Sequence, residues 1–125
     1  MSMPPRVLII DDDYSLLEAY TELLAEDFCV VTATTGEEGL ARLQCEDVDV
    51  VLLDVRLPGM DGLEVLCQIK AHHAHVEVLM HTASNEPHLV RVARQCGAAD
   101  YLVKPVENAD LLIRLQQAVR CAAPR

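Results

Sequence analysis

The hydrophobic residues of this chain gather into five short runs, and each run ends where polar residues begin. The runs occupy positions 7–10, 29–33, 48–53, 76–80 and 101–103. Short apolar runs between turn signals are typical of strands that are buried on both faces of a sheet. The pattern therefore predicts five buried strands.

Between these runs, apolar residues recur at the spacing of amphipathic helices. The predicted helical positions are Leu16, Leu17, Tyr20, Leu23 and Leu24; Leu40 and Leu43; Leu63, Leu66 and Ile69 (or Val65); Leu89, Val90, Val92, Ala93 and Cys96; and Leu111, Leu112, Leu115 and Val119. Asp13 and Asp61 are candidate helix N-caps, and a Thr-x-x-Glu capping box begins at Thr35. Pro87 suits a helix start and Gly97 a helix end.

Strand and helix alternate five times, which predicts an α/β fold with a doubly wound parallel sheet and helices on both faces. Function in such sheets collects outside the carboxyl ends of the strands. The chemically notable residues follow this rule. Asp11 and Asp12 end the first strand, Asp54 ends the third, Thr82 the fourth and Lys104 the fifth.

Converging carboxylates repel one another unless a cation joins them. An all-oxygen site suits Mg²⁺, which also favours phosphate oxygens. Beside this metal, Lys104 adds a positive charge and Thr82 a hydroxyl donor. Asp54 is thus equipped to attack phosphorus and form an acyl phosphate. No glycine-rich nucleotide-binding motif is present, so a nucleotide is not the expected donor.

Composition narrows the class of protein further. A length of 125 residues predicts one domain, and the formal net charge of −10 argues against direct nucleic-acid binding. No apolar run has the length of a membrane span. The five cysteines are odd in number and have no CxxC spacing, so we expect reduced, mostly buried thiols in a cytoplasmic protein.

The ordered motifs carry a resemblance to a known family. They are Asp11-Asp12, the stretch from Asp54 to Gly62 with Leu-Pro-Gly-Met-Asp-Gly at its end, Thr82-Ala83, and Lys104-Pro105. With this set the chain resembles the receiver domain of two-component response regulators. The likeness covers about residues 6–120 of a single domain, and 121–125 are expected to be a tail or the start of a linker.

The resemblance implies a flavodoxin-like, chemotaxis-regulator-like sheet with strand order 2-1-3-4-5. Asp54 matches the phosphoacceptor, and Thr82 and Lys104 match the residues that bind phosphoryl oxygens. Asp12 matches the main Mg²⁺ (or Mn²⁺) ligand, with Asp54 as a further ligand and Asp11 in support. The backbone carbonyl of Arg56 matches the third protein ligand.

The same resemblance implies a switch. Tyr101 matches the aromatic residue that turns inward when Thr82 moves toward the phosphoryl group, although a plain half-buried strand tyrosine is the alternative. Arg56 and Ser84 match positions that tune the lifetime of the phosphoryl group. The Lys104–Pro105 bond is expected to be cis. Val106 stands where the family most often has phenylalanine, which changes packing and leaves the chemistry alone.

The implied partners are a histidine kinase or phosphotransfer protein as phosphohistidine donor, and an output domain or target that the residues do not identify. The last two helices and the fifth strand form the expected partner or homodimer surface. The chain is either a stand-alone regulator or a receiver cut from a longer protein. Two other functions stay open, namely a small phosphohydrolase and a receiver-like interaction module that works without phosphorylation.

Five further positions are interpreted from the sequence, and four of them have competing interpretations. Asp13 is an alternative metal ligand if the acidic triplet is read one residue later, but we assign it to the helix cap. His72, His73 and His75 are expected in a surface loop, with a metal site or a phosphorelay histidine as alternatives. His81 is interpreted as a packed histidine.

Overall fold

The computed structural model describes residues 3–121, and within them five strands alternate with five helices. The elements are β1 (Arg6–Ile10), α1 (Tyr14–Leu24), β2 (Cys29–Ala33), α2 (Gly36–Cys45), β3 (Val50–Leu53), α3 (Gly62–His72), β4 (Glu77–Thr82), α4 (Pro87–Gln95), β5 (Asp100–Val103) and α5 (Asn108–Cys121). Every predicted strand and helix is present. None of the helices in this part of the chain combines the length and apolar character that a membrane span requires.

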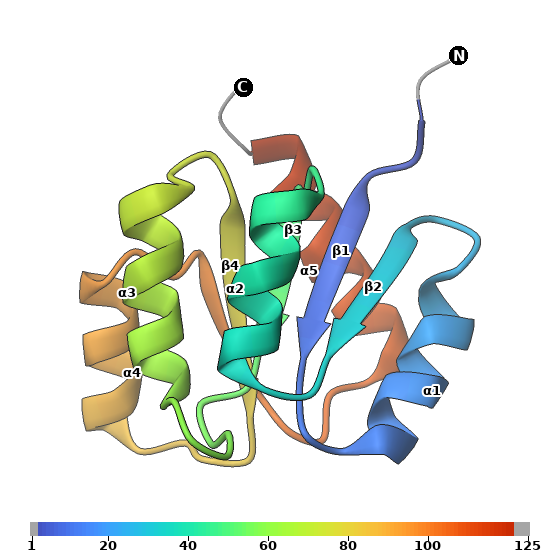
Figure 1. Ribbon diagram of the computed structural model, residues 1–125. Coiled ribbons are helices and arrows are strands. Elements are labelled where there is room, and N and C mark those ends of the chain that lie inside the picture. Colours follow the sequence, from blue (N-terminus) through green and yellow to red (C-terminus); the bar gives the residue numbers. More distant parts are fainter. Residues whose placement is uncertain (1–2, 122–125) are drawn as a thin grey trace.

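The five strands form one parallel sheet in the order β2-β1-β3-β4-β5, as predicted. The register places Leu8 beside Val31 on one side and Val51 on the other. Because all strands run in the same direction, their carboxyl ends meet at one edge of the sheet. This is the lower edge in Figure 1, where the β1 and β2 arrows end.

Each face of the sheet has its own aliphatic core, because successive side chains of a strand point to opposite faces. From β1, Leu8 and Ile10 pack with residues of α2, α3 and α4. Val7 and Ile9 point the other way and pack with residues of α1 and α5. Figure 1 shows the same layers, with α2 and α3 in front of the sheet and α5 behind it.

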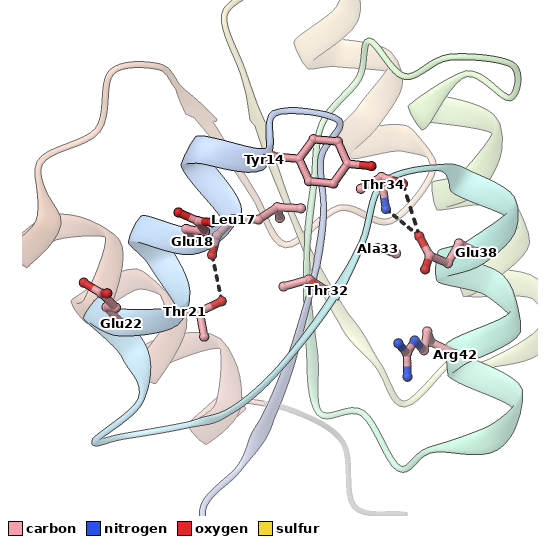
Figure 2. Close-up of a pocket in the computed structure, with 10 residues that line it drawn as sticks. All are labelled: Tyr14, Leu17, Glu18, Thr21, Glu22, Thr32, Ala33, Thr34, Glu38 and Arg42. Carbon is pink, nitrogen blue, oxygen red and sulfur yellow. Dashed lines mark hydrogen bonds between the residues drawn. The ribbon is translucent and has the colours of Figure 1, made fainter.

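Side-chain caps start three of the helices at the predicted residues. Asp13, Thr35 and Asp61 each accept a hydrogen bond from a backbone amide two or three residues later. The capping box at α2 differs in one bond. The Glu38 carboxylate accepts from the backbone amide of Thr34 at 2.7 Å (Figure 2), one residue before the cap that the pattern predicts as its partner.

The strand boundaries differ from the apolar runs by one or two residues. β1 and β5 each begin one residue earlier than predicted, at Arg6 and Asp100, and β4 reaches Thr82. β3 begins at Val50, although Val48 is also buried. A strand extends as far as its backbone hydrogen bonds to the neighbouring strand continue. Polar residues can therefore belong to a strand, and a buried apolar residue outside this hydrogen-bonding pattern does not belong to it.

The prediction of mostly buried thiols is wrong. All five cysteines lie within residues 3–121; Cys45, Cys67 and Cys121 are exposed, and Cys29 and Cys96 are half-buried. On the helices, leucine, valine, isoleucine, alanine and glycine fill the buried positions. Cys67, for example, follows buried Leu66 directly and therefore points about 100° away from it around α3.

Candidate functional site

The sheet itself positions the backbone of the site. The amides of Asp11 and Asp54 donate to carbonyls of neighbouring strands at 3.0 and 3.1 Å, just past the ends of β1 and β3. The amide of Lys104 donates to the carbonyl of Thr82 at 2.8 Å. The strand ladders thus extend one residue beyond the strands. As a result, side chains that lie far apart in the sequence meet at the carboxyl edge.

Three carboxylates form the acidic cluster of this edge. Oxygens of Asp11, Asp12 and Asp54 all lie within 4.8 Å of one another. Asp11 and Asp54 are only 2% and 7% exposed, whereas Asp12 is exposed. Hard carboxylate oxygens in this number suit a divalent cation such as Mg²⁺, so the donor set fits the predicted metal. Asp13 lies outside the cluster and caps α1.

The alternative of a metal site at His72, His73 and His75 is not supported. Within residues 3–121, the acidic cluster is the one group of three or more histidine, cysteine, aspartate or glutamate residues arranged closely enough to hold a metal ion. His72 ends α3, and His73 is its C-cap. His73 and His75 therefore lie in the turn after α3, as the surface-loop interpretation predicts, whereas His72 still belongs to the last turn of the helix.

Lys104 joins the two buried carboxylates. Its Nζ atom lies 2.8 Å from Asp11 Oδ2 and 3.2 Å from Asp54 Oδ2. Burial raises the pKa of Asp11, and the hydrogen bond from Lys104 offsets part of this effect. Burial lowers the pKa of Lys104, but the hydrogen bond to Asp11 and the charge of Asp54 raise it more. The peptide bond from Lys104 to Pro105 is cis, as expected.

The loop after β3 orients Asp54. The backbone amide of Arg56 donates to Asp54 Oδ1 at 3.1 Å, while Oδ2 faces Lys104. The amide of Gly62 donates to the carbonyl of Val55 at 2.9 Å, which brings the start of α3 against the strand end. A Cβ atom at Gly62 would lie 2.1 Å from the carbonyl oxygen of Asp54. Only glycine fits this close approach.

A chain of contacts leads from the site toward the α4–β5 side. Thr82 is 1% exposed, and its Oγ1 atom accepts a hydrogen bond from the Ser84 amide at 3.4 Å. The Tyr101 hydroxyl donates to the Ser84 carbonyl at 2.8 Å. Tyr101 is half-buried against the core of the α2–α3–α4 face, and this burial raises its pKa. The backbone of Ser84 therefore connects Thr82 with Tyr101.

Sequence reasoning missed the partner of His81. This histidine is 1% exposed, and its Nε2 atom lies 3.1 Å from the hydroxyl of Tyr20 on α1. Burial lowers the pKa of His81 to about 4; Lys104 lowers it further, and Asp54 partly offsets this. The two residues are 61 positions apart, so no local pattern signals the contact.

We expect His81 to make the fold sensitive to acid. Between its ordinary pKa of 6.5 and the folded-state value of about 4, the unfolded chain protonates this histidine and the folded chain does not. The contribution of neutral His81 to the free energy of unfolding is therefore fully present above pH 6.5, and it is lost as the pH falls from 6.5 to about 4. Measured by urea unfolding, the free energy of unfolding of the wild type should fall by about 3 kcal/mol more than that of His81→Gln between pH 7 and pH 4. Parallel pH profiles for the two proteins would contradict this assignment.

A separate groove of about 550 Å³ lies between α1 and α2 over the edge strand β2 (Figure 2). Glu18 and Glu22 line it from α1, and Glu38 and Arg42 line it from α2. None of the residues of the acidic cluster contributes to its wall. The groove is therefore distinct from the candidate site.

Known proteins are similar to this chain in sequence and in fold. The family model described as "Response regulator receiver domain" matches residues 7–116. The transcriptional regulatory protein AruR of Pseudomonas aeruginosa is 37% identical over an alignment of 128 positions. The alignment covers 96% of this chain and 51% of AruR. The CheY-like receiver domain protein of Methanospirillum hungatei superposes with a TM-score of 0.91 at 30% identity, covering 94% of this chain and 95% of that one. The CheX–CheY–BeF3–Mg²⁺ complex of Borrelia burgdorferi gives a TM-score of 0.86 at 31% identity, covering 92% and 89%.

Fold and site together define a phosphorylatable signalling domain of two-component systems rather than a turnover enzyme. The chain belongs to the response regulator receiver domain family. It spans about half the length of the curated relatives AruR and AfsQ1 of Streptomyces coelicolor.

Proposed function

We propose that Asp54 is the residue that accepts the phosphoryl group, and that the donor is a phosphohistidine of a sensor kinase or phosphotransfer protein. A carboxylate oxygen of Asp54 attacks phosphorus, the nitrogen–phosphorus bond breaks, and the imidazole leaves. The product is an acyl phosphate. The observation that carries the proposal is the position of Asp54, which is buried among acids at a strand end with one oxygen 3.2 Å from Lys104.

Lys104 and Thr82 are the proposed ligands of the phosphoryl oxygens. The Lys104 ammonium already faces Asp54 Oδ2, the oxygen beside which the new charge would arrive. Thr82 ends β4, the neighbour of β3 in the sheet, and its hydroxyl is a hydrogen-bond donor. A preorganised cation and a hydroxyl stabilise charge that develops on the transferring group.

We assign the metal site to Asp12 and Asp54, with the backbone carbonyl of Arg56 as third protein ligand and Asp11 in support. The clustered carboxylate oxygens support this assignment, and the Borrelia CheY complex contains Mg²⁺. A bound Mg²⁺ or Mn²⁺ would neutralise charge on the carboxylates and on the phosphoryl oxygens. Asp11 would hold the Lys104 ammonium beside this metal through their 2.8 Å contact.

The switch that we propose runs through Thr82, Ser84 and Tyr101. Movement of the Thr82 hydroxyl toward a phosphoryl group would release its bond from the Ser84 amide, and Tyr101 is bonded to the carbonyl of the same serine. The affected surface would be the α4–β5–α5 face, where Val103 and Ile113 are 39% and 49% exposed. Exposed apolar side chains on an edge strand and its flanking helix suit a partner or a second copy of the chain.

Arg56 and Ser84 are the proposed tuning residues for the lifetime of the acyl phosphate. The side chain of Arg56 is exposed beside the site, and Ser84 is half-buried two residues after Thr82. A bulky cation at one position and a small hydroxyl at the other would control the access of water to the phosphoryl group.

The domain assignment is also a proposal, with a single receiver core of about residues 6–120 in a cytoplasmic protein. α5 includes Cys121, so the start of the expected tail is still helical. The rest of the expected tail or linker, residues 122–125, lies outside the described residues.

The proposal is tested by incubating the protein with acetyl phosphate and Mg²⁺ and measuring its intact mass. We expect one phosphoryl adduct per chain, no adduct after EDTA treatment, and recovery when Mg²⁺ is restored. Asp12→Asn should raise the Mg²⁺ concentration needed for half-maximal labelling by roughly tenfold or more, because it removes a charged ligand. Continuous phosphate release without an adduct would favour the phosphohydrolase. The absence of labelling both with and without Mg²⁺ would favour the interaction module.

A further inference from the structure

Two cysteines lie side by side on the surface formed by α3 and α4. Cys67 belongs to α3, and Cys96 is the C-cap residue of α4. Their Sγ atoms are 3.2 Å apart, although 29 positions separate them in the chain. Cys67 is exposed and Cys96 is half-buried, so a reagent in solution can reach the pair. The remaining cysteines lie on three other elements, β2, α2 and α5.

Packing holds the two thiols close to each other. α3 is anchored by buried Val65, Leu66 and Ile69. The residue after Cys96 is Gly97, and a Cβ atom there would lie 3.2 Å from Cγ of Lys70, so the end of α4 rests against α3.

A disulfide has a sulfur–sulfur distance of about 2.05 Å, so the two sulfurs need to approach by only about 1.2 Å from their present 3.2 Å. α4 buries a single side chain, that of Ala93, within its own length. Leu89 and Cys96 pack against the same core but are only partly buried. A helix with one fully buried side chain can move by about an ångström at a low cost in free energy.

We infer that Cys67 and Cys96 are an oxidation site, which a low-molecular-weight disulfide such as glutathione disulfide converts into an intramolecular disulfide bond. Cys67, the more exposed thiol, loses its proton and attacks one sulfur of the oxidant. The sulfur–sulfur bond of the oxidant breaks, and the departing glutathione sulfur takes up a proton to become one glutathione thiol. Cys96 then attacks Cys67 Sγ in the mixed disulfide and releases a second glutathione thiol. Two protein thiols lose two electrons and two protons, and the oxidant gains them.

The bond would tie the end of α4 to α3, next to the face that carries Tyr101. It would also close a loop between positions 67 and 96, which restricts the unfolded chain. We expect the oxidised protein to unfold at a temperature roughly 10 °C higher than the reduced protein. This site uses none of the residues of the acidic cluster, so its test is independent of phosphoryl transfer.

The experiment is oxidation of the full chain with glutathione disulfide, followed by alkylation, trypsin digestion and mass spectrometry. The hydrogen bond to Cys96, burial and the charge of nearby Glu64 all raise the pKa of Cys67. The reaction should therefore be run at about pH 8.5, where more thiolate is present. Trypsin leaves Cys67 in the peptide 57–70 and Cys96 in the peptide 95–114. We expect these two peptides to be disulfide-linked. Each of the other three cysteines should be either alkylated or bound to glutathione, and none should be linked to another cysteine of the chain.

Single variants separate this pair from general thiol oxidation. Cys96→Ser should stop at the first step and keep glutathione on Cys67, whereas Cys45→Ser, a change at another exposed helical cysteine, should leave the 57–70 to 95–114 link unchanged. The inference is overturned if both cysteines keep glutathione without linking. It is also overturned if other cysteine pairs link equally well, or if the linked product is a covalent dimer.

Discussion

Asp54→Asn should abolish phosphorylation of this chain by acetyl phosphate. The amide oxygen and nitrogen of asparagine are poor nucleophiles, and they supply no negative charge for a metal. The fold should survive, because Lys104 keeps its 2.8 Å contact with Asp11 and one of the repelling buried acids is removed. Intact mass after incubation with Mg²⁺ and acetyl phosphate gives the result directly, with an adduct in the wild type and none in the variant.

Asp61→Asn is the matched control for this prediction. It makes the same chemical change seven residues later in the same loop, where Asp61 caps α3. Asparagine is an equally good cap, so this variant should be labelled like the wild type. Labelling of Asp54→Asn at the wild-type level, with both variants folded by circular dichroism, would contradict the assignment.

Lys104→Met should slow labelling by acetyl phosphate roughly 100-fold, because it removes a preorganised cation from the transferring group. It should also lower the free energy of unfolding at pH 7 by about 2 kcal/mol, since Asp11 and Asp54 then lie buried without their shared partner. That loss should shrink as the pH falls. Burial already raises the pKa of Asp11, and without Lys104 the folded state would bind a proton there still more readily.

Lys70→Met controls for the loss of a lysine. Lys70 is the other lysine of the chain, and its Nζ atom donates to the backbone carbonyls of Ala74 and Val76, away from the acidic cluster. Its labelling rate should equal that of the wild type. Equal rates for Lys104→Met and the wild type would remove Lys104 from the account of phosphoryl transfer.

The sequence was sufficient to predict the fold because its signals are local and agree with one another. Apolar runs marked the strands, and capping residues marked the helix starts at Asp13, Thr35 and Asp61. The acidic cluster also followed from topology, since parallel strands deliver Asp11, Asp54 and their neighbours to one edge. Strand ends were less predictable, because pairing continues through polar residues wherever the backbone ladder does.

Contacts between distant side chains could not be predicted. The bond between Tyr20 and His81 joins α1 to β4, and the close sulfurs of Cys67 and Cys96 join α3 to α4. Neither pair has a spacing that marks it in the sequence. The expected burial of the cysteines failed for a related reason. Hydrophobicity predicts that a cysteine can be buried, but the orientation of each helix decides which apolar residues fill the core.

The central claim is that the phosphoryl group resides on the carboxylate of Asp54. Borohydride reduces an acyl phosphate to an alcohol, which turns a phosphorylated aspartate into homoserine. After labelling with acetyl phosphate and reduction, fragmentation of the tryptic peptide 43–56 should place homoserine at position 54 and leave Asp47 and Asp49 unchanged. Homoserine at Asp11, at Asp12 or at another carboxylate, or a phosphoryl group that resists reduction, would contradict the claim.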